Sequence, residues 1–473
     1  MALRETVAIA GVTGFVGRAL AERLSADYRV VGLSRMPPDR SGSHAEWRRC
    51  DLFSLLQCES ALEGVDSAFY LVHSMLPSAH LTHGAFQDFD LICADNFARA
   101  AAKAGVRQII YLGGLIPREG GLSRHLQSRL EVEQTLGSRG VPVAALRAGI
   151  VIGAGGSSYR MLKTLIERVP IIPCPPLAMS LTQPVALDDV LALLRYSLEH
   201  PVPESRAFDI GSPDVMSYRE LLERTARLLG LKRRFVGLPR LATFWCRRWL
   251  AVATGAPREL VAPLVESVKH TIVCRDRGLQ EEAGIPGIPF DEAVRKAEER
   301  EKDLASSGSA FPVPPRRPWR ALSRYDVRSV QRMPLPRGRT ARWAAEQYGL
   351  FLPRFFHVLL RADIDYQRNV RFRFPFTKVT LVELTFARDR SEGSDRQVFY
   401  ITGGLLARQL ARPTRRPRLE FREVLGGRVL LVAIHDYRPA LPWPLYNWTQ
   451  ALIHLWAMKG FARYLAGLAP PRE

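Results

Sequence analysis

The chain has 473 residues, of which 47% are hydrophobic and 24% are charged. These proportions are typical of folded globular protein and exclude a disordered or collagen-like chain, and the length indicates two or three domains. The net charge of +20 is unevenly placed. Residues 316–473 hold 29 Lys and Arg against 12 Asp and Glu, whereas residues 1–315 are almost balanced, with 38 against 35. Any argument about acidic partners therefore concerns the last third of the chain.

The N-terminal part alternates short apolar runs with helical patterns. Strands are expected at Thr6–Ala10, Arg29–Leu33, Ser67–Leu71, Gln108–Leu112 and Val143–Arg147. Amphipathic helices are expected between them, at Val16–Leu24, Leu52–Leu62, Asp88–Ala104 and His125–Ser138. Strands separated by helices predict a parallel, doubly wound α/β sheet of the Rossmann type. After these elements the pattern loosens and prolines multiply, as in an appended substrate lobe.

A proline-rich segment separates this region from a second one. Residues 305–320 read ASSGSAFPVPPRRPWR and follow a charged helical segment at Asp291–Leu304. We therefore predict a domain over residues 1–304, a linker over 305–320 and a second domain over 321–473. Strand patterns follow at Asn369–Phe376, Val379–Ala387, Gln397–Gly403, Arg418–Val424 and Val429–Asp436, and an apolar helix at Trp443–Leu465. The second domain is expected to be α+β, with an antiparallel sheet and a long terminal helix.

The first expected strand ends in the loop Gly11-Val-Thr-Gly-Phe-Val-Gly17, which leads directly into a helix. In such a loop one glycine allows the sharp turn, a second lets backbone N–H groups approach a pyrophosphate, and a third lets the helix pack close to the strand. The helix N-terminus adds partial positive charge. We therefore predict that a dinucleotide is bound by the loop residues Gly11, Thr13, Gly14, Phe15, Val16 and Gly17.

The end of the second strand indicates which dinucleotide is bound. A carboxylate there would bind the ribose 2′-hydroxyl of NAD, whereas an arginine accommodates the 2′-phosphate of NADP. The sequence has Arg35 and no carboxylate before Asp39, so NADP(H) is preferred and NAD(H) stays open; the plainer interpretation is a solvated arginine. Asp51 and Leu52 are expected near the adenine. His73 follows the third of these strands and is expected beside the cofactor or in solvent.

These motifs resemble the short-chain dehydrogenase/reductase superfamily, in particular its atypical extended, NmrA-like branch that binds NAD(P)H. Besides the glycine loop, the resemblance rests on Asp51-Leu52, Tyr111–Leu115, Leu122–Glu133, Leu146–Gly153 and Gln183–Val190. It covers roughly residues 5–300. It implies a Rossmann fold and a nicotinamide cofactor but does not identify a substrate. Our own hypothesis is an unidentified small, apolar or lipid-like substrate.

Active members of this family use a serine, a tyrosine and a lysine, the last two spaced Tyr-x-x-x-Lys on one helix face. The resemblance places His125 at the tyrosine position, Arg129 at the lysine position, and Gly113 or Gly114 at the serine position. Two interpretations follow. One is an oxidoreductase or epimerase-like enzyme in which His125 donates the proton. The other is a protein that binds NADP(H) without turnover and acts as a regulator or structural subunit. In both, Arg129 and Gly113 contact the cofactor.

The arginine-rich second domain allows three interpretations: nucleic-acid binding, contact with an anionic membrane, or an ordinary half-buried sheet with a solvated face. The nucleic-acid surface would consist of Arg371, Phe372, Arg373, Phe374, Arg415, Arg416, Arg418, Phe421 and Arg422. The membrane surface would use Trp443, Trp448 and Trp456 as interfacial aromatic residues. The ordinary sheet is favoured, with peripheral membrane contact next and nucleic acid last.

The size and strand count of this domain loosely resemble a helix-grip, START-like or DUF2867-type domain, in which a curved sheet wraps a helix around an apolar cavity. The resemblance implies that Trp448, Leu452, Leu455, Trp456 and Tyr464 face a ligand. The alternative is that these side chains pack on the sheet.

The cysteines and histidines indicate neither a metal site nor a disulfide framework. The six cysteines are scattered without metal-ligand spacing, so the thiols are expected to be reduced and buried. No apolar run is long enough to span a membrane, and no leader pattern precedes the first strand, which together predict a soluble, cytoplasmic protein.

Overall fold

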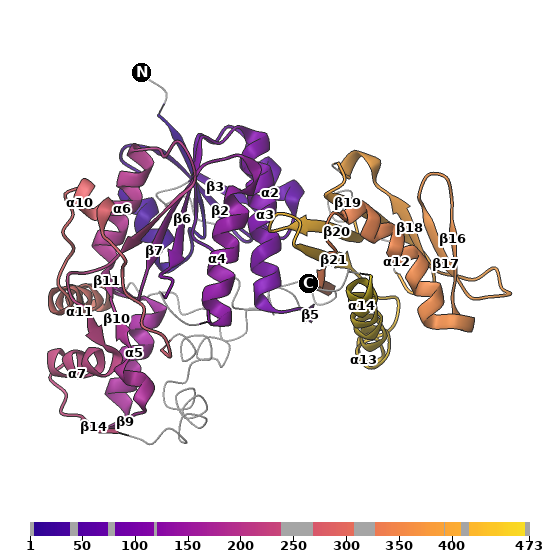
Figure 1. Ribbon diagram of the computed structural model, residues 1–473. Coiled ribbons are helices and arrows are strands. Elements are labelled where there is room, and N and C mark those ends of the chain that lie inside the picture. Colours follow the sequence, from indigo (N-terminus) through magenta and orange to yellow (C-terminus); the bar gives the residue numbers. More distant parts are fainter. Residues whose placement is uncertain are drawn as a thin grey trace. The chain divides into compact units, whose positions relative to one another are not determined.

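The computed structural model describes residues 4–37, 46–73, 81–117, 121–237, 268–306, 327–391, 393–407 and 416–468. The chain divides into two compact units (Figure 1). Unit 1 comprises Met1–Met75 and Cys93–Val313, and unit 2 comprises Leu76–Ile92 and Pro314–Glu473. Most of the expected linker, residues 307–320, lies outside the described residues. The domain bounds drawn from the sequence stay a prediction.

Unit 1 is built on a seven-stranded sheet with the order β12-β7-β6-β4-β1-β2-β3. The strands are β1 (Thr6–Ala10), β2 (Arg29–Ser34), β3 (Glu46–Arg49), β4 (Ser67–Tyr70), β6 (Gln108–Gly114), β7 (Val143–Ala148) and β12 (Arg206–Ile210). Every neighbouring pair is parallel. This confirms the predicted Rossmann-type fold. The strand order reverses at β1 and β4, and folds of this type bind ligands in the crevice outside the carboxyl ends of the strands at that point.

Helices cover both faces of this sheet: α1 (Phe15–Leu24), α2 (Leu55–Ala61), α3 (Phe86–Ala104), α4 (Arg124–Leu136) and α6 (Leu187–Glu199). Residues of α2, α3 and α4 pack on one face, and residues of α1 and α6 pack on the other. Strands covered on both faces carry continuous apolar runs rather than alternation. Accordingly β1, with the sequence TVAIA, is buried at every position.

A smaller lobe follows β7. Its strands form three two-stranded pairs: β8 (Val151–Ile152) with β11 (Val185–Ala186), β9 (Ile171–Cys174) with β14 (Arg234–Gly237), and β10 (Leu181–Thr182) with β13 (Met216–Ser217). Its helices are α5 (Ser157–Arg168), α7 (Tyr218–Leu228), α10 (Gly278–Glu282) and α11 (Phe290–Ser306).

Short 3-10 turns lie at Gly137–Arg139, Pro176–Met179, His357–Leu359 and Arg388–Arg390 along the chain. Cys50, Cys58, Cys93 and Cys174 are buried free thiols and Cys274 is half-buried, while Cys246 lies outside the described residues.

Unit 2 contains an eight-stranded sheet with the order β16-β17-β18-β19-β20-β21-β15-β5. Its strands are β5 (Leu81–His83), β15 (Val327–Pro334), β16 (Arg361–Ile364), β17 (Val370–Arg373), β18 (Thr380–Phe386), β19 (Arg396–Gly403), β20 (Arg418–Val424) and β21 (Val429–Tyr437). All pairs are antiparallel except β15 with β5. The helices are α12 (Ala341–Phe356), α13 (Trp443–Trp448) and α14 (Gln450–Gly467).

The antiparallel sheet and C-terminal helix confirm the α+β prediction for this unit. From residue 327 the chain runs strand, helix, six strands and terminal helices, with the first strand β15 beside the last strand β21. The relationship to START-like or DUF2867-type domains stays a prediction.

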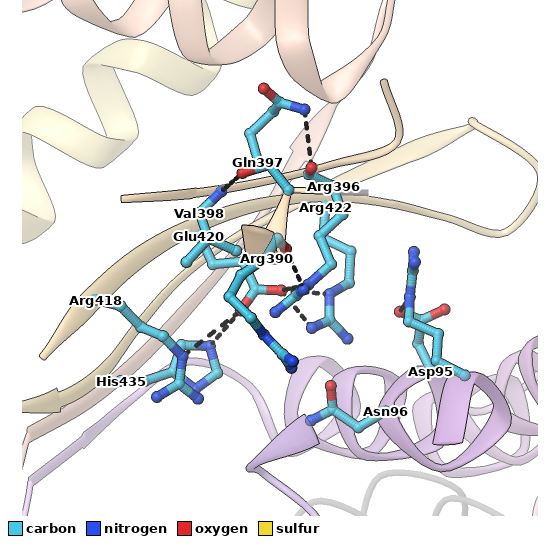
Figure 2. Close-up of polar contacts among 12 residues, drawn as sticks. Asp95, Asn96, Arg390, Arg396, Gln397, Val398, Arg418, Glu420, Arg422 and His435 are labelled. Carbon is cyan, nitrogen blue, oxygen red and sulfur yellow. Dashed lines mark hydrogen bonds and ion pairs between the residues drawn. The ribbon is translucent and has the colours of Figure 1, made fainter. Parts of the chain in front are cut away.

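The arginines of β19 and β20 lie in a buried ion cluster (Figure 2). Side chains alternate along a strand, so Leu419 and Phe421 face α12 and α14 while Arg418, Glu420 and Arg422 point to the other face. Arg396 Nε lies 2.7 Å and Arg422 Nε 2.8 Å from Glu420 Oε1. Arg422 and Glu420 are each 1% exposed. The expectation that the arginine face is solvated is therefore wrong at these positions.

Two titrating groups of this cluster are strongly shifted. Burial alone would raise the pKa of Glu420, but Arg396 and Arg422 outweigh it and hold that pKa well below its usual value. His435 Nε2 lies 3.3 Å from Glu420 Oε2. Burial, aided by Arg418, lowers the pKa of His435 from 6.5 to about 4, so this histidine is neutral at pH 7. Arg418 also pairs with Asp436 at 3.0 Å.

The C-terminal helical region differs from the sequence-based expectation. A break at Thr449, with φ −126° and ψ −85°, divides the expected single helix into α13 and α14. Trp448 is 79%, Leu452 54% and Trp456 56% exposed. These side chains therefore neither pack on the sheet nor line a cavity between sheet and helix, and both expectations for them are wrong. Tyr464 is half-buried, and its hydroxyl bonds Gln347 Oε1 at 2.8 Å.

Among the helices that the structure describes, none is both apolar enough and long enough to cross a membrane. Within the same residues, no group of three His, Cys, Asp or Glu side chains is placed to hold a metal ion.

Candidate functional site

The glycine loop connects the carboxyl end of β1 to the start of α1. Gly11 has φ +92°, a left-handed conformation that favours glycine, and a Cβ there would lie 2.7 Å from the carbonyl oxygen of Leu71. A Cβ on Gly17 would lie 2.3 Å from the carbonyl oxygen of Gly11. The N–H of Gly14 donates to that same oxygen at 2.8 Å. The loop is therefore a tight concave turn whose shape depends on the absence of side chains.

The first turn of α1 presents backbone N–H groups at this loop. Gly14 is the N-cap residue and provides no side-chain cap. The initial N–H groups of a helix have no partner within the helix and, with the helix dipole, form a binding site for a phosphate. Thr13 is exposed, and its carbonyl accepts a bond from Arg18 Nη2 at 3.2 Å. Val16 is half-buried and packs against the core under α1.

Phe15 connects the loop to the smaller lobe. Its ring atoms lie 2.9 Å from a Cβ placed on Gly153 and 3.0 Å from one placed on Gly156. The segment Leu146–Gly153, one of those on which the family resemblance rests, therefore reaches the glycine loop at Gly153. A side chain at Gly153 would force Phe15 or Leu187 to move, and one at Gly156 would leave only a tight contact with Phe15.

The residues expected at the adenosine end lie after β2 and β3. Arg35 directly follows β2 and is exposed, and the role predicted for it toward a 2′-phosphate stays a prediction. Asp51 Oδ1 accepts the N–H of Phe53 at 3.2 Å, and the carbonyl of Leu52 accepts Asn96 Nδ2 at 2.8 Å. Asp51 and Leu52 thus fix the turn between β3 and α2, and the roles predicted for them toward a ligand stay predictions.

His73 and His125 lie together. Nε2 of His73 is 3.2 Å from Nδ1 of His125, so one ring donates a hydrogen bond to the other. His73 follows β4, and His125 is the second residue of α4, whose N-cap Ser123 accepts the N–H of Leu126 at 3.3 Å. Both histidines are half-buried. From the sequence we proposed a role near the cofactor for each histidine separately, but we did not predict that the two side chains are in contact.

Arg129 lies one helical turn after His125. The hydroxyl of Tyr111 donates to the backbone carbonyl of Arg129 at 3.2 Å, and Arg129 Nη1 lies 3.5 Å from that hydroxyl. A Cβ on Gly114 would contact Leu126 and Arg129, whereas a Cβ on Gly113 would meet the Tyr111 ring at 2.9 Å. Of the two glycines considered for the serine position, Gly114 is therefore the one that faces α4.

A Tyr-x-x-x-Lys spacing that was not identified from the sequence occurs outside the expected position, at Tyr159 and Lys163 on α5. The hydroxyl of Tyr159 donates to Glu298 Oε1 at 2.8 Å, and Lys163 Nζ lies 2.7 Å from both Glu298 and Glu301 of α11. Tyr159 is fully buried, and burial and Glu298 raise its pKa. A lysine paired with two carboxylates and a tyrosine with a raised pKa are poorly suited to acid catalysis. The side chains of Tyr159 and Lys163 instead connect α5 to α11.

Known proteins are similar to the N-terminal part of the chain. Residues 7–116 match the model of the NAD dependent epimerase/dehydratase family. The auxiliary protein GraX of Staphylococcus aureus is 32% identical over 143 residues, which are 30% of this chain and 43% of GraX. The ceramide reductase of Caulobacter vibrioides is 28% identical over 251 residues, which are 50% of this chain and 74% of that enzyme. The uncharacterized protein Rv2047c of Mycobacterium tuberculosis is 26% identical over 225 residues, or 47% of this chain. The chain thus spans less than half of GraX and 23% of Rv2047c.

Solved structures share the fold. The triphenylmethane reductase of a Citrobacter species, complexed with NADP(H), superposes with a TM-score of 0.50 and 17% identity over 62% of this chain and 99% of its own. The NADPH-dependent quinone oxidoreductase QOR2 of Escherichia coli, complexed with NADPH, gives a TM-score of 0.50 and 18% identity over 61% of this chain and 98% of its own.

Proposed function

We propose that this protein, whose N-terminal unit belongs to the extended short-chain dehydrogenase/reductase superfamily and binds a nicotinamide dinucleotide, is an NADPH-dependent reductase of a small apolar or lipid-like carbonyl compound. The observation that carries the proposal is the His73–His125 pair, which follows the strand beside the glycine loop and occupies the place where the family resemblance expects a proton donor. Two relatives support the substrate class through their names, a ceramide reductase and an alkanoyl-oxo-dihydrofuranyl-methyl phosphate reductase.

The residues present fit a dinucleotide. The three loop glycines allow the tight turn that a pyrophosphate-binding loop uses, since a Cβ on Gly11, Gly14 or Gly17 would lie within 3.0 Å of backbone atoms of the chain itself. The uncapped start of α1 offers N–H groups to the phosphates. Arg35 supports NADP(H) over NAD(H), because an exposed guanidinium at the end of β2 suits a 2′-phosphate.

The chain's own residues would complete the reduction that NADPH begins. The bound cofactor supplies a hydride to the carbonyl carbon. His125 hydrogen-bonds the carbonyl oxygen, polarises the C=O bond and gives its proton to that oxygen, which yields an alcohol. His73, in contact with His125 Nδ1, then passes a proton from solvent to the imidazole and restores it. Arg129, held by Tyr111, stays charged and stabilises negative charge one turn away.

The test is turnover with NADPH and a series of long-chain aldehydes and ketones, followed by the loss of NADPH absorbance. His125→Ala is expected to lower kcat about 100-fold or more, the usual contribution of a positioned proton donor, with NADPH affinity retained. His73→Ala should lower kcat less and shift the pH profile of the remaining activity. Tyr159→Phe is the matched control, because it removes the tyrosine hydroxyl of the Tyr-x-x-x-Lys spacing on α5, away from His125. Unchanged kcat in His125→Ala would exclude the mechanism.

A second candidate is a regulator that binds NADP(H) without turnover. It is supported by the replacement of all three family catalytic side chains at His125, Arg129 and Gly114, and by the similarity to a protein named as auxiliary. NADPH binding by calorimetry together with no turnover across the carbonyl series would favour this candidate. Binding of neither NADPH nor NADH would refute both.

A further inference from the structure

The exposed face of α13 and α14 is apolar. On α14 the exposed apolar side chains of Leu452 (54% exposed), Ile453 (51%) and Trp456 (56%) lie along one stripe, and α13 adds the exposed side chains of Leu445 (50%) and Trp448 (79%). The opposite stripe is buried against the sheet and consists of Ala451, Ala457, Met458, Phe461 and Leu465. The terminal helices are therefore apolar on both sides, which a helix covering a sheet does not require. Large exposed apolar patches mark interaction sites.

The same stripe ends in positive charge. After Trp456 it continues through Lys459 and Arg463, both exposed. Residues 437–468 contain no Asp or Glu. Trp456 packs on Phe355 of α12 at a ring distance of 4.3 Å, and the exposed stripe of α12 there contains Leu350 and Arg354. Residues 347–362 also lack acidic side chains. α14 thus presents apolar and cationic side chains together, and the acidic residue of α12, Glu346, pairs with Arg342 at 3.3 Å.

We propose that this α13–α14 face docks the protein onto the surface of an anionic lipid membrane. Tryptophan has an apolar body and a polar N–H, and it prefers the interface between lipid headgroups and acyl chains. Lysine and arginine at the end of the stripe reach lipid phosphates while their stems remain on the apolar side. Charge complementarity identifies the lipid as anionic. α14 lies in the interface, because no described helix is apolar enough to cross.

A protein partner fits this face less well. A second copy of this chain would bring Lys459 and Arg463 against an equally cationic surface, since the interface of a symmetric dimer uses the same patch twice. A nucleic acid would match the charge but not the aliphatic side chains at Leu445, Leu452 and Ile453. The proposal does not depend on reductase activity, so it stands or falls separately from the proposed function.

The experiment uses the full-length protein and sedimentation with vesicles. One set is phosphatidylcholine alone, and the other contains about one third phosphatidylglycerol. Binding is expected only with the second set, together with a blue shift of tryptophan fluorescence and quenching by brominated acyl chains. Added salt should weaken binding. No sedimentation with the anionic vesicles, or equal binding to both sets, would overturn the proposal.

The decisive variant is Trp448→Glu with Leu452→Glu. Both side chains are more than half exposed, so the substitutions should leave the fold intact. The partition coefficient for anionic vesicles is expected to fall about tenfold or more. The control is Tyr366→Glu, a 93% exposed aromatic residue in the turn between β16 and β17, which should bind like the wild type. Equal binding by the double variant, or a lipid-free dimer that this variant abolishes in the ultracentrifuge, would refute membrane docking.

Discussion

Replacement of Gly17 by alanine tests the geometry of the glycine loop. The new Cβ would lie 2.3 Å from the carbonyl oxygen of Gly11, 2.8 Å from its carbonyl carbon and 2.9 Å from the Cα of Val12. All three are backbone atoms, so no change of rotamer can relieve the overlap. The loop has to move by about 1 Å to restore an ordinary contact, and such overpacking costs about 1–3 kcal/mol of folding stability.

The same displacement moves the N–H groups that are proposed to hold the pyrophosphate. Misplacing binding groups by about 1 Å weakens their hydrogen bonds, and we expect NADPH affinity to fall about tenfold to a hundredfold, a loss of about 1.4–2.8 kcal/mol. Isothermal titration calorimetry measures the affinity, and urea unfolding measures the stability and shows that the variant is folded.

Gly237→Ala is the matched control for this experiment. It lies in β14 of the same unit, and a Cβ there would meet nothing within 4 Å. Its NADPH affinity and stability should equal those of the wild type. If folded Gly17→Ala binds NADPH as tightly as the wild type, the loop does not hold the cofactor and the reasoning from its glycines is refuted.

Three further substitutions test individual side chains. Arg35→Ala is expected to weaken NADPH binding about tenfold and leave NADH binding unchanged, because only the 2′-phosphate contact is lost; an unchanged ratio of the two Kd values would exclude that contact. Tyr159→Phe should destabilise the fold by about 1 kcal/mol in urea unfolding through loss of its bond to Glu298. His435→Gln should flatten the pH dependence of stability. The pKa of His435 is about 4 in the fold and 6.5 in a free side chain. The contribution of this neutral histidine to the free energy of unfolding is therefore fully present above pH 6.5, and about 3 kcal/mol of it is lost as the pH drops to 4. Parallel slopes of the two proteins over this range would show that His435 is not buried neutral.

The sequence predicted unit 1 well because its main signals are local. The strand, turn and helix around Gly11–Gly17 are consecutive, and buried parallel strands carry apolar runs that need no knowledge of their neighbours. The His73–His125 pair is of a different kind. It joins residues 52 positions apart, and nothing in either local sequence shows that the end of β4 lies beside the start of α4. The sequence could select the two histidines individually, but only the fold brings them together.

Unit 2 shows the limit more clearly. Alternation of arginine with apolar residues in β20 is read correctly as strand, because the period of two is a backbone property. The same alternation does not show which face of the strand meets solvent. A polar face predicts exposure, yet Arg422 and Glu420 are buried, since Arg396 of β19 pairs with Glu420 across neighbouring strands and Arg422 pairs with Glu420 along β20. The prediction for the terminal helix is wrong in the opposite way. Trp448 is apolar and was expected to pack on the sheet or face a ligand, but it is exposed. Cross-strand pairing and helix orientation are tertiary effects.

The buried arginines and the exposed tryptophan also bear on how the net charge acts at the surface. Of the 29 Lys and Arg side chains after residue 315, some pair with the 12 acidic residues of the same region, among them Arg418 with Asp436, Arg371 with Glu383 and Arg373 with Asp363. The excess of 17 positive charges is therefore carried by other side chains. At the α13–α14 face itself the attraction depends on a few exposed cations, Lys459 and Arg463 among them, beside large apolar side chains. Binding to anionic vesicles should therefore show the shallow salt dependence of a few charges, and Trp448→Glu with Leu452→Glu should weaken it more than Lys459→Gln with Arg463→Gln. The reverse order would mean that the charges, and not the apolar stripe, hold the protein at the membrane.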